Sequence, residues 1–170
     1  MQIPRYHEFK GRIDRLVGDI NGRFSSNTWL PVQYHFRSLD RDDLLAHYRA
    51  CDIAFVTPLK DGMNLVAKEY CACRIEQDGV LILSQFAGAA EQLKPGAVLV
   101  NPYDVEQMAD AILAAFRMGE AERKTRMKRM RRGVRKENVF WWVDSFLKAG
   151  AKLVARSERV ACPRHLRVTG

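Results

Sequence analysis

Three short and almost continuous apolar runs constrain the fold of this chain more than any other feature of its sequence. They cover residues 52–57 (DIAFVT), 79–84 (GVLILS) and 97–101 (AVLVN). Strands that are apolar throughout, instead of at every second residue, are typical of parallel sheets with both faces buried. An earlier apolar run, residues 29–36 (WLPVQYHF), is predicted as a further strand that precedes these three.

Helical patterns alternate with these runs. A helix is predicted over residues 5–24, and another after Asp40, where the sequence reads RDDLLAHYRA. Asp104 precedes VEQMADAILAAF with Gln107 three residues later, which is the arrangement of a capping box. The alternation of strand and helix predicts a parallel sheet with crossover helices, so the expected fold class is α/β and Rossmann-like.

The last third of the chain is predicted to be helical up to Gly150. Two helices are expected over residues 105–118 and 120–148, divided at Gly119. An aromatic cluster near the end of the second helix is interpreted as packing residues; it consists of Phe140, Trp141, Trp142 and Phe146. Residues 151–170 are basic and lose periodicity, so we expect a disordered tail after a domain that covers residues 1–150.

A net charge of +8 raises the question of a nucleic-acid partner. Much of the excess lies in residues 117–137, which hold ten Lys and Arg against three Glu. Met127, Met130 and Val134 recur there at steps of three and four, which predicts an amphipathic helix with a basic outer face. No aromatic residue is interleaved with the charges, so a solvated face is favoured over an RNA- or DNA-binding stripe.

Neither a membrane partner nor a metal is expected. The sequence contains no apolar run of about 20 residues, and its first residues lack the apolar core of a signal peptide, so a cytoplasmic location is predicted. Cys71 and Cys73 form a C-x-C pair without a second pair or a histidine at ligand spacing, which is a poor zinc site. These thiols and Cys51 are predicted to be reduced and to pack as small apolar side chains.

The segment TPLKDGMNLVAKEY follows the first of the three buried runs and carries the candidate chemistry. Ligands of parallel α/β sheets bind beyond the carboxyl ends of the strands. Free N–H groups near Asn64 and Leu65 would suit phosphate oxygens, and Gly62 would let the backbone approach a ligand closely. Asp61 would accept hydrogen bonds from hydroxyls, and Glu69, on the helix face of Leu65, from a diol such as ribose. Phosphate, sugar hydroxyls and ribose occur together in a nucleotide sugar, so a nucleotide-sugar site is predicted. The alternative is a generic strand–turn–helix junction in which Glu69 is buried or salt-bridged.

The wider segment VTPLKDGMNLVAKEY resembles the nucleotide-sugar signature of the trehalose-6-phosphate synthases, the retaining glycosyltransferases of family 20. Further similar segments follow the order of that family over residues 6–148: INGRF, the stretch from RSL to YRACD, GVLILSQFAGAAEQL and VNPYD. The resemblance implies the C-terminal half of a GT-B enzyme with two Rossmann-like domains. It implies transfer of glucose from UDP-glucose to glucose 6-phosphate, giving trehalose 6-phosphate without a metal or other cofactor.

The resemblance also implies roles for individual residues in donor binding. Those implied at the donor glucose are Asp61, Gly62, Met63 and Asn64. The N–H groups of Asn64 and Leu65 are implied to bind the diphosphate. Glu69 is implied to bind the ribose, and Leu39 and Leu44 are implied to lie beside the uracil.

No residue of this chain matches the catalytic and acceptor-binding groups of the family, which are expected upstream in an N-terminal acceptor domain. The acceptor is therefore open, and glucosylglycerol-phosphate synthase of the same family is the nearest alternative. A non-catalytic nucleotide-sugar binding module and a basic nucleic-acid-binding domain are further alternatives. Whether identical chains assemble with one another is also left open.

Overall fold

The computed structural model of this chain describes residues 4–161. The chain divides into two compact units, Met1–Asp40 and Arg41–Gly170. Among the described residues, no helix combines the length and the apolar character that a membrane crossing needs.

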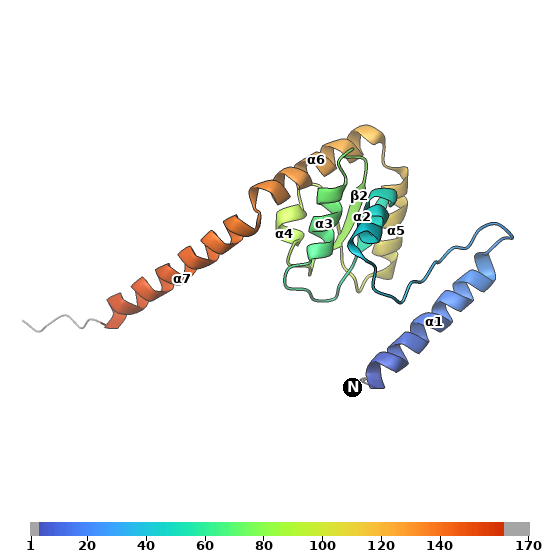
Figure 1. The fold of residues 1–170 in the computed structure, drawn as a ribbon, viewed down its shortest axis with the longest axis horizontal. Helices are drawn as coiled ribbons and strands as arrows, with labels where there is room; N and C mark the ends of the chain where they lie inside the picture. The colour runs from blue at the N-terminus through green and yellow to red at the C-terminus, as the bar shows by residue number, and fades with distance from the viewer. Residues whose placement is uncertain (1–3, 162–170) are drawn as a thin grey trace, which may run out of the picture. The chain divides into compact units, whose positions relative to one another are not determined.

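The second unit is built on a parallel three-stranded sheet (Figure 1). Its strands are β1 (Ile53–Val56), β2 (Val80–Ser84) and β3 (Val98–Val100), in that order across the sheet. The register places Ala54 opposite Leu81. The three apolar runs are thus confirmed as strands, and the predicted α/β class with a parallel sheet is confirmed with them.

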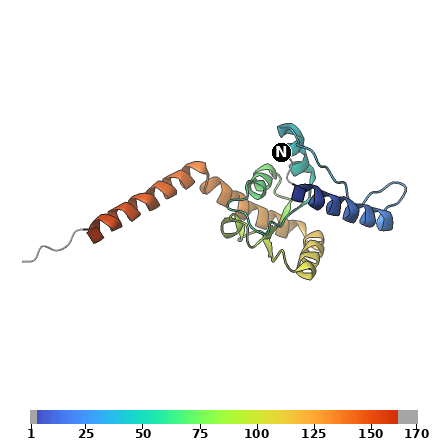
Figure 2. The same ribbon diagram turned by 90° about the horizontal axis from the view of Figure 1, so that it is seen from below.

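Helices cover both faces of this sheet. They are α2 (Arg41–Ala50), α3 (Leu65–Cys73), α4 (Ala90–Leu93), α5 (Val105–Arg117) and α6 (Glu120–Lys136). Leu81 and Leu83 of β2 are buried in one core cluster with residues of α3, α4 and α6. Val80 and Ile82, which alternate with them, are buried in a second cluster with residues of α5. This alternation explains why β2 is apolar at every position, and Figure 2 shows the helices around the sheet from below.

The N-terminus of α5 is capped as predicted. The Asp104 carboxylate accepts the backbone N–H of Gln107 at 2.9 Å. The reciprocal bond of the predicted capping box is shifted: the side chain of Gln107 accepts the N–H of Asn101 at 2.6 Å, whereas the Asp104 N–H donates to the Asn101 carbonyl. α5 ends at Arg117 and α6 begins at Glu120, which confirms the division at Gly119.

The single helix predicted over residues 120–148 is wrong, because α6 ends at Lys136 and α7 (Val139–Ala161) begins anew. Asn138 explains the break. Its side-chain oxygen accepts the backbone N–H groups of Phe140 and Trp141 at 3.0 and 3.1 Å and so caps the new helix. The expected end of helical structure at Gly150 is also wrong, since α7 continues to Ala161. The predicted disorder of the final nine positions concerns residues that lie outside the described part of the chain.

The aromatic cluster of α7 does not pack in a core, contrary to expectation. Phe140 is 80% exposed and Phe146 is 64% exposed. Trp142 stacks on Phe146 with ring centroids 5.5 Å apart. α7 leads away from the sheet after the bend that follows α6, so the described residues leave its aromatic face open (Figure 1).

In the first unit, α1 (Pro4–Phe24) is formed as predicted, but the strand predicted over residues 29–36 is absent. The side-chain amide of Asn21 donates to the carbonyl of Val32 and accepts its N–H, both at 2.9 Å. Pro31 has no N–H to offer a sheet. At positions 31 and 32, in the middle of the predicted strand, the backbone groups that a sheet would use are therefore missing or occupied, and the apolar pattern alone could not reveal this.

The cysteines follow the prediction only in part. Cys71 is buried, and burial raises the pKa of its thiol to about 12. Cys73 is half-buried, whereas Cys51 is exposed, so the expectation that it packs as a small apolar side chain is wrong. Cys162 lies outside the described residues.

Candidate functional site

The candidate site begins with a tight turn after β1 that the Asp61 carboxylate organises. One carboxylate oxygen accepts the backbone N–H groups of Met63 and Asn64 at 3.0 and 2.9 Å. The other accepts the side-chain amide of Asn64 at 2.9 Å. The Met63 N–H, followed by the Asn64 side chain, lowers the pKa of Asp61 below its ordinary value. Asp61 is therefore an ionised acceptor at neutral pH.

Asn64 connects this turn to α3. Its backbone is left-handed with φ 58°, a conformation that Asn tolerates better than most residues, and its side chain accepts the N–H of Ala67 at 2.9 Å. The N–H groups of Leu65 and Val66 make no hydrogen bond to another described residue. Two exposed donors thus lie at the positive end of the α3 dipole, which is an arrangement suited to an anion.

The turn after β2 holds the first turn in place. The Gly88 N–H donates to the Asp61 carbonyl at 2.8 Å, and Asp61 pairs with Ala87 in an isolated parallel bridge. A Cβ atom on Gly88 would lie 2.1 Å from the carbonyl oxygen of Gly62. A glycine is required here by this close approach of two backbones. Gly62 differs, since a Cβ atom there would meet no atom within 4 Å, which leaves its outer side open.

Glu69 is exposed on α3, and one of its carboxylate oxygens accepts a hydrogen bond from the Tyr48 hydroxyl at 3.1 Å. Partial burial, followed by this bond to Glu69, raises the pKa of Tyr48 to about 12. Tyr48 therefore remains a neutral donor that orients Glu69. Glu69 is neither buried nor paired with a cation among the described residues, which removes the main support for a generic structural role.

A surface hollow of about 550 Å³ lies beside the two turns. Backbone and side chains from several elements line it, among them Gly62, Met63, Lys68, Gly88, Glu91, Trp141 and Trp142. The open side of the first turn therefore faces a space large enough for a sugar-sized ligand.

The structure brings most, but not all, of the predicted site residues together. Asp61, Asn64 and Leu65 meet at the start of α3, with Glu69 one turn further along the same helix. The Asn64 N–H, predicted as a diphosphate donor, is already used by Asp61. Leu44 is half-buried in α2, whereas Leu39 belongs to the first unit, so the predicted place of both beside the uracil stays a prediction.

Sequence reasoning missed several residues that support the site. Tyr48 was hidden because its partner is 21 residues away in the sequence. Arg74 is 3% exposed, and its guanidinium donates to the carbonyl of Arg49 at the end of α2 and to Asp78 at 2.6 Å. It anchors α2 against α3, and nothing in its local sequence distinguishes it from a surface arginine. The free N–H of Val66 was also missed. The hydrogen bonds that cap the start of α3 decide which N–H groups stay free, and these bonds are seen only in the structure.

This geometry defines a Rossmann-like domain with an open helix N-terminus and two carboxylates at the carboxyl edge of a parallel sheet. Residues 1–152 match the family described as Glycosyltransferase family 20. The chain belongs to this family.

Two curated relatives illustrate the similarity. Trehalose-6-phosphate synthase of Mycobacterium leprae is 45% identical over 155 residues, which are 91% of this chain and 31% of the relative. Glucosylglycerol-phosphate synthase of Synechocystis is 44% identical over 143 residues, which are 84% of this chain and 28% of the relative. The chain thus spans about a third of the length of the relatives it matches.

Solved structures agree with this family. A UDP-forming α,α-trehalose-phosphate synthase from Burkholderia xenovorans has a TM-score of 0.82 and 47% identity, covering 86% of this chain and 33% of that one. A protein of the same name and organism, in complex with glucose-6-phosphate, has a TM-score of 0.82 and 41% identity over 87% of this chain and 32% of that one. An E. coli protein bound with UDP-2-fluoro glucose has a TM-score of 0.82 and 39% identity, covering 86% of this chain and 33% of that one.

Proposed function

We propose that this chain is the donor-binding part of a retaining glycosyltransferase that transfers glucose from UDP-glucose to glucose 6-phosphate. The observation that carries the proposal is the pair of free N–H groups of Leu65 and Val66 beside the ionised Asp61. The bound UDP-2-fluoro glucose and glucose-6-phosphate of the two related structures support these substrate classes.

Electrostatics assign each part of the donor to one part of the site. The ionised Asp61 would repel a diphosphate but accept hydrogen bonds from sugar hydroxyls, so the glucose belongs beside Asp61 and the open side of Gly62. The diphosphate belongs over the N–H groups of Leu65 and Val66. Glu69 has one oxygen that no described residue uses, and this oxygen is available to a ribose hydroxyl.

The proposed reaction breaks the bond between the anomeric carbon of glucose and the diphosphate. Negative charge then develops on the leaving diphosphate, where the α3 N–H groups would stabilise it. Cationic groups of the acceptor domain expected upstream would supply the remaining stabilisation, so we propose a reaction that requires no metal. Asp61 and Glu69 act as binding acceptors in this proposal, not as the acid and nucleophile of a glycosidase.

The direct test is an NMR titration of the ¹⁵N-labelled chain with UDP and UDP-glucose. The amide resonances of Leu65 and Val66 are expected to shift on saturation. The first turn of α5 is a matched control, because Val105 and Glu106 occupy the same positions after a capped N-terminus but follow β3, which is separated from β1 by β2 in the sheet. Shifts of equal size at both helices would indicate unspecific anion binding and contradict the proposal.

Glucosylglycerol-phosphate synthase is the second candidate, favoured by a relative of that name at 44% identity. It shares the donor and differs in the acceptor, and the acceptor-binding residues are expected outside this chain. Incubation of the chain with UDP-glucose and either glucose 6-phosphate or glycerol 3-phosphate is expected to release no UDP. Activity that returns with the upstream half, and only with one acceptor, would identify the reaction. Efficient turnover by the isolated chain would contradict the donor-half proposal, whereas no activity with either acceptor would favour a binding module.

A further inference from the structure

The outer face of α6 carries a stripe of five cations, defined here as the basic stripe. Its members recur at steps of three and four residues and all of them are exposed; they are Lys128, Arg129, Arg132, Arg135 and Lys136. Arg132 is the centre of the stripe, because the other four lie three or four residues from it. Like charges at these spacings repel one another on a helix.

Other cations of α6 have partners, which sets the basic stripe apart. Lys124 pairs with Glu120 at 2.5 Å, and Arg126 pairs with Glu122 at 2.8 Å. Arg131 donates to the carbonyl of Cys71 at 2.7 Å, near the end of α3. Within the described part of the chain, no member of the basic stripe forms an ion pair with a carboxylate. The repulsion along this face is therefore uncompensated by the protein.

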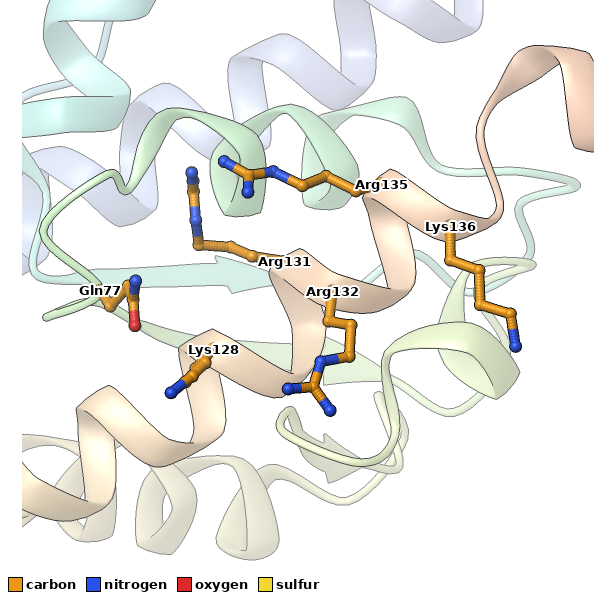
Figure 3. Close-up of a pocket in the computed structure, with 6 residues that line it drawn as sticks. All are labelled: Gln77, Lys128, Arg131, Arg132, Arg135 and Lys136. Atoms are coloured by element: carbon orange, nitrogen blue, oxygen red, sulfur yellow. The ribbon is translucent and has the colours of Figure 1, made fainter.

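Two adjoining surface hollows follow the basic stripe. The larger, of about 510 Å³, is shown in Figure 3 and is lined by Gln77, Lys128, Arg131, Arg132, Arg135 and Lys136. The smaller, of about 300 Å³, is lined by Thr125, Lys128, Arg129 and Arg132. Lys128 and Arg132 line both hollows, so the cationic surface is continuous along the helix.

The lining of these hollows indicates the class of ligand. Apart from the cations it contains only the neutral polar residues Gln77 and Thr125, and no aromatic side chain on which a base could stack. A ligand that fits has closely spaced negative charges along a line and needs no base recognition. Neither hollow is lined by a residue of the segment from Asp61 to Glu69, so this surface is separate from the donor site.

We propose that the basic stripe of α6 binds a linear, phosphate-rich polyanion of the inorganic polyphosphate type. The stripe supplies five cations along one helix face, and two cation-lined hollows admit successive phosphates. Binding releases counterions and therefore weakens steeply with salt. It does not depend on UDP-glucose.

The test measures binding of fluorescently labelled inorganic polyphosphate to the 170-residue chain by anisotropy over a range of salt concentrations. Five neutralised phosphates predict a slope of log K against log salt of about −3.5 to −4.5. The variant K128Q/R132Q/R135Q retains two stripe cations, so its slope is expected to fall to about −1 to −2, with affinity at low salt at least about tenfold weaker.

The matched control removes the same net charge from paired positions. The variant K10Q/K124Q/K148Q replaces three lysines that each pair with an acid four residues away. Its polyphosphate affinity is expected to stay within about twofold of wild type, because exposed i,i+4 pairs present little free charge. Circular dichroism and UDP binding establish that both variants are folded.

Equal loss of affinity in both variants would overturn the proposal, because net charge alone would then explain binding. Absence of polyphosphate binding at low salt would also overturn it. Binding to duplex RNA or DNA, or to vesicles rich in phosphatidylserine, without binding to polyphosphate would replace the proposed ligand with one of those partners. None of these outcomes bears on the amide shifts at Leu65 and Val66, so the donor-site proposal is tested separately.

Discussion

Replacement of Gly88 by Ala is expected to displace the turn that forms the candidate donor site. A Cβ atom at this position would lie 2.1 Å from the carbonyl oxygen and 2.5 Å from the carbonyl carbon of Gly62. Both are backbone atoms, so no side-chain rotation can relieve the clash. The two turns would have to separate by at least about 1.3 Å to restore an ordinary contact.

The cost of this separation follows from the contacts it breaks. Overpacking of this kind destabilises a protein by about 1–3 kcal/mol. The hydrogen bond from the Gly88 N–H to the Asp61 carbonyl, 2.8 Å long, contributes about 0.5–1.5 kcal/mol and would be weakened or lost. The free energy of unfolding is therefore expected to fall by about 2–4 kcal/mol. UDP-glucose affinity should fall by about tenfold or more, because the same shift displaces Asp61 and the start of α3, whose hydrogen bonds to the donor each contribute about 0.5–1.5 kcal/mol.

Thermal unfolding and calorimetric titration with UDP-glucose measure the two effects. Gly62→Ala is the control, because its Cβ meets no atom within 4 Å and no described glycine has a positive φ. That variant should melt like wild type, with weaker donor binding if the sugar approaches Gly62. If Gly88→Ala kept the melting temperature and the UDP-glucose affinity of wild type, the inferred contact between the two turns would be refuted.

Three further predictions concern the carboxylates and the tyrosine. Asp61 has a pKa below its ordinary 3.8, so its contribution to the free energy of unfolding is present above about pH 4 and is lost as pH falls through the folded pKa. Asp61→Asn should therefore remove this part of the acid unfolding curve. The pKa of Tyr48 is raised from 10.0 to about 12, so its contribution to the free energy of unfolding is present below pH 10 and is lost as pH rises toward 12. Tyr48→Phe should therefore flatten the alkaline unfolding curve in that interval, and an unchanged curve would contradict this prediction. Glu69→Ala should weaken UDP binding by about 1–3 kcal/mol in calorimetry, whereas Tyr48→Phe should weaken it less; equal affinity of wild type and Glu69→Ala would remove Glu69 from the site.

Local sequence was sufficient for the features that depend on neighbours in the chain. The apolar run of β2 was recognised because both of its faces are covered, and the runs of β1 and β3 share its pattern although Phe55 and Leu99 remain partly exposed. The cap at Asp104 needed only Gln107, three residues away. The same reasoning located the turn from Asp61 to Asn64, because a polar, glycine-containing turn that joins a buried strand to a helix can be read directly.

Local sequence failed where a side chain competed for the backbone or where a partner was distant. Asn21 occupies both backbone groups of Val32, which are then unavailable to a strand at that position. Asn138 begins a new helix inside a pattern that was read as continuous. The aromatic face of α7 was read as core because periodicity reports an apolar face but not what covers it.

The sequence by itself determined the parallel α/β fold and the position of the candidate site at the start of α3. Only the tertiary structure decided which groups are free to bind, because a hydrogen-bond donor is available only after its internal partners are known. It showed that the Asn64 N–H is used by Asp61, whereas Leu65 and Val66 remain available. It also placed Tyr48 on Glu69 and Gly88 against Gly62, since contacts between distant segments depend on how the helices and turns pack on the sheet.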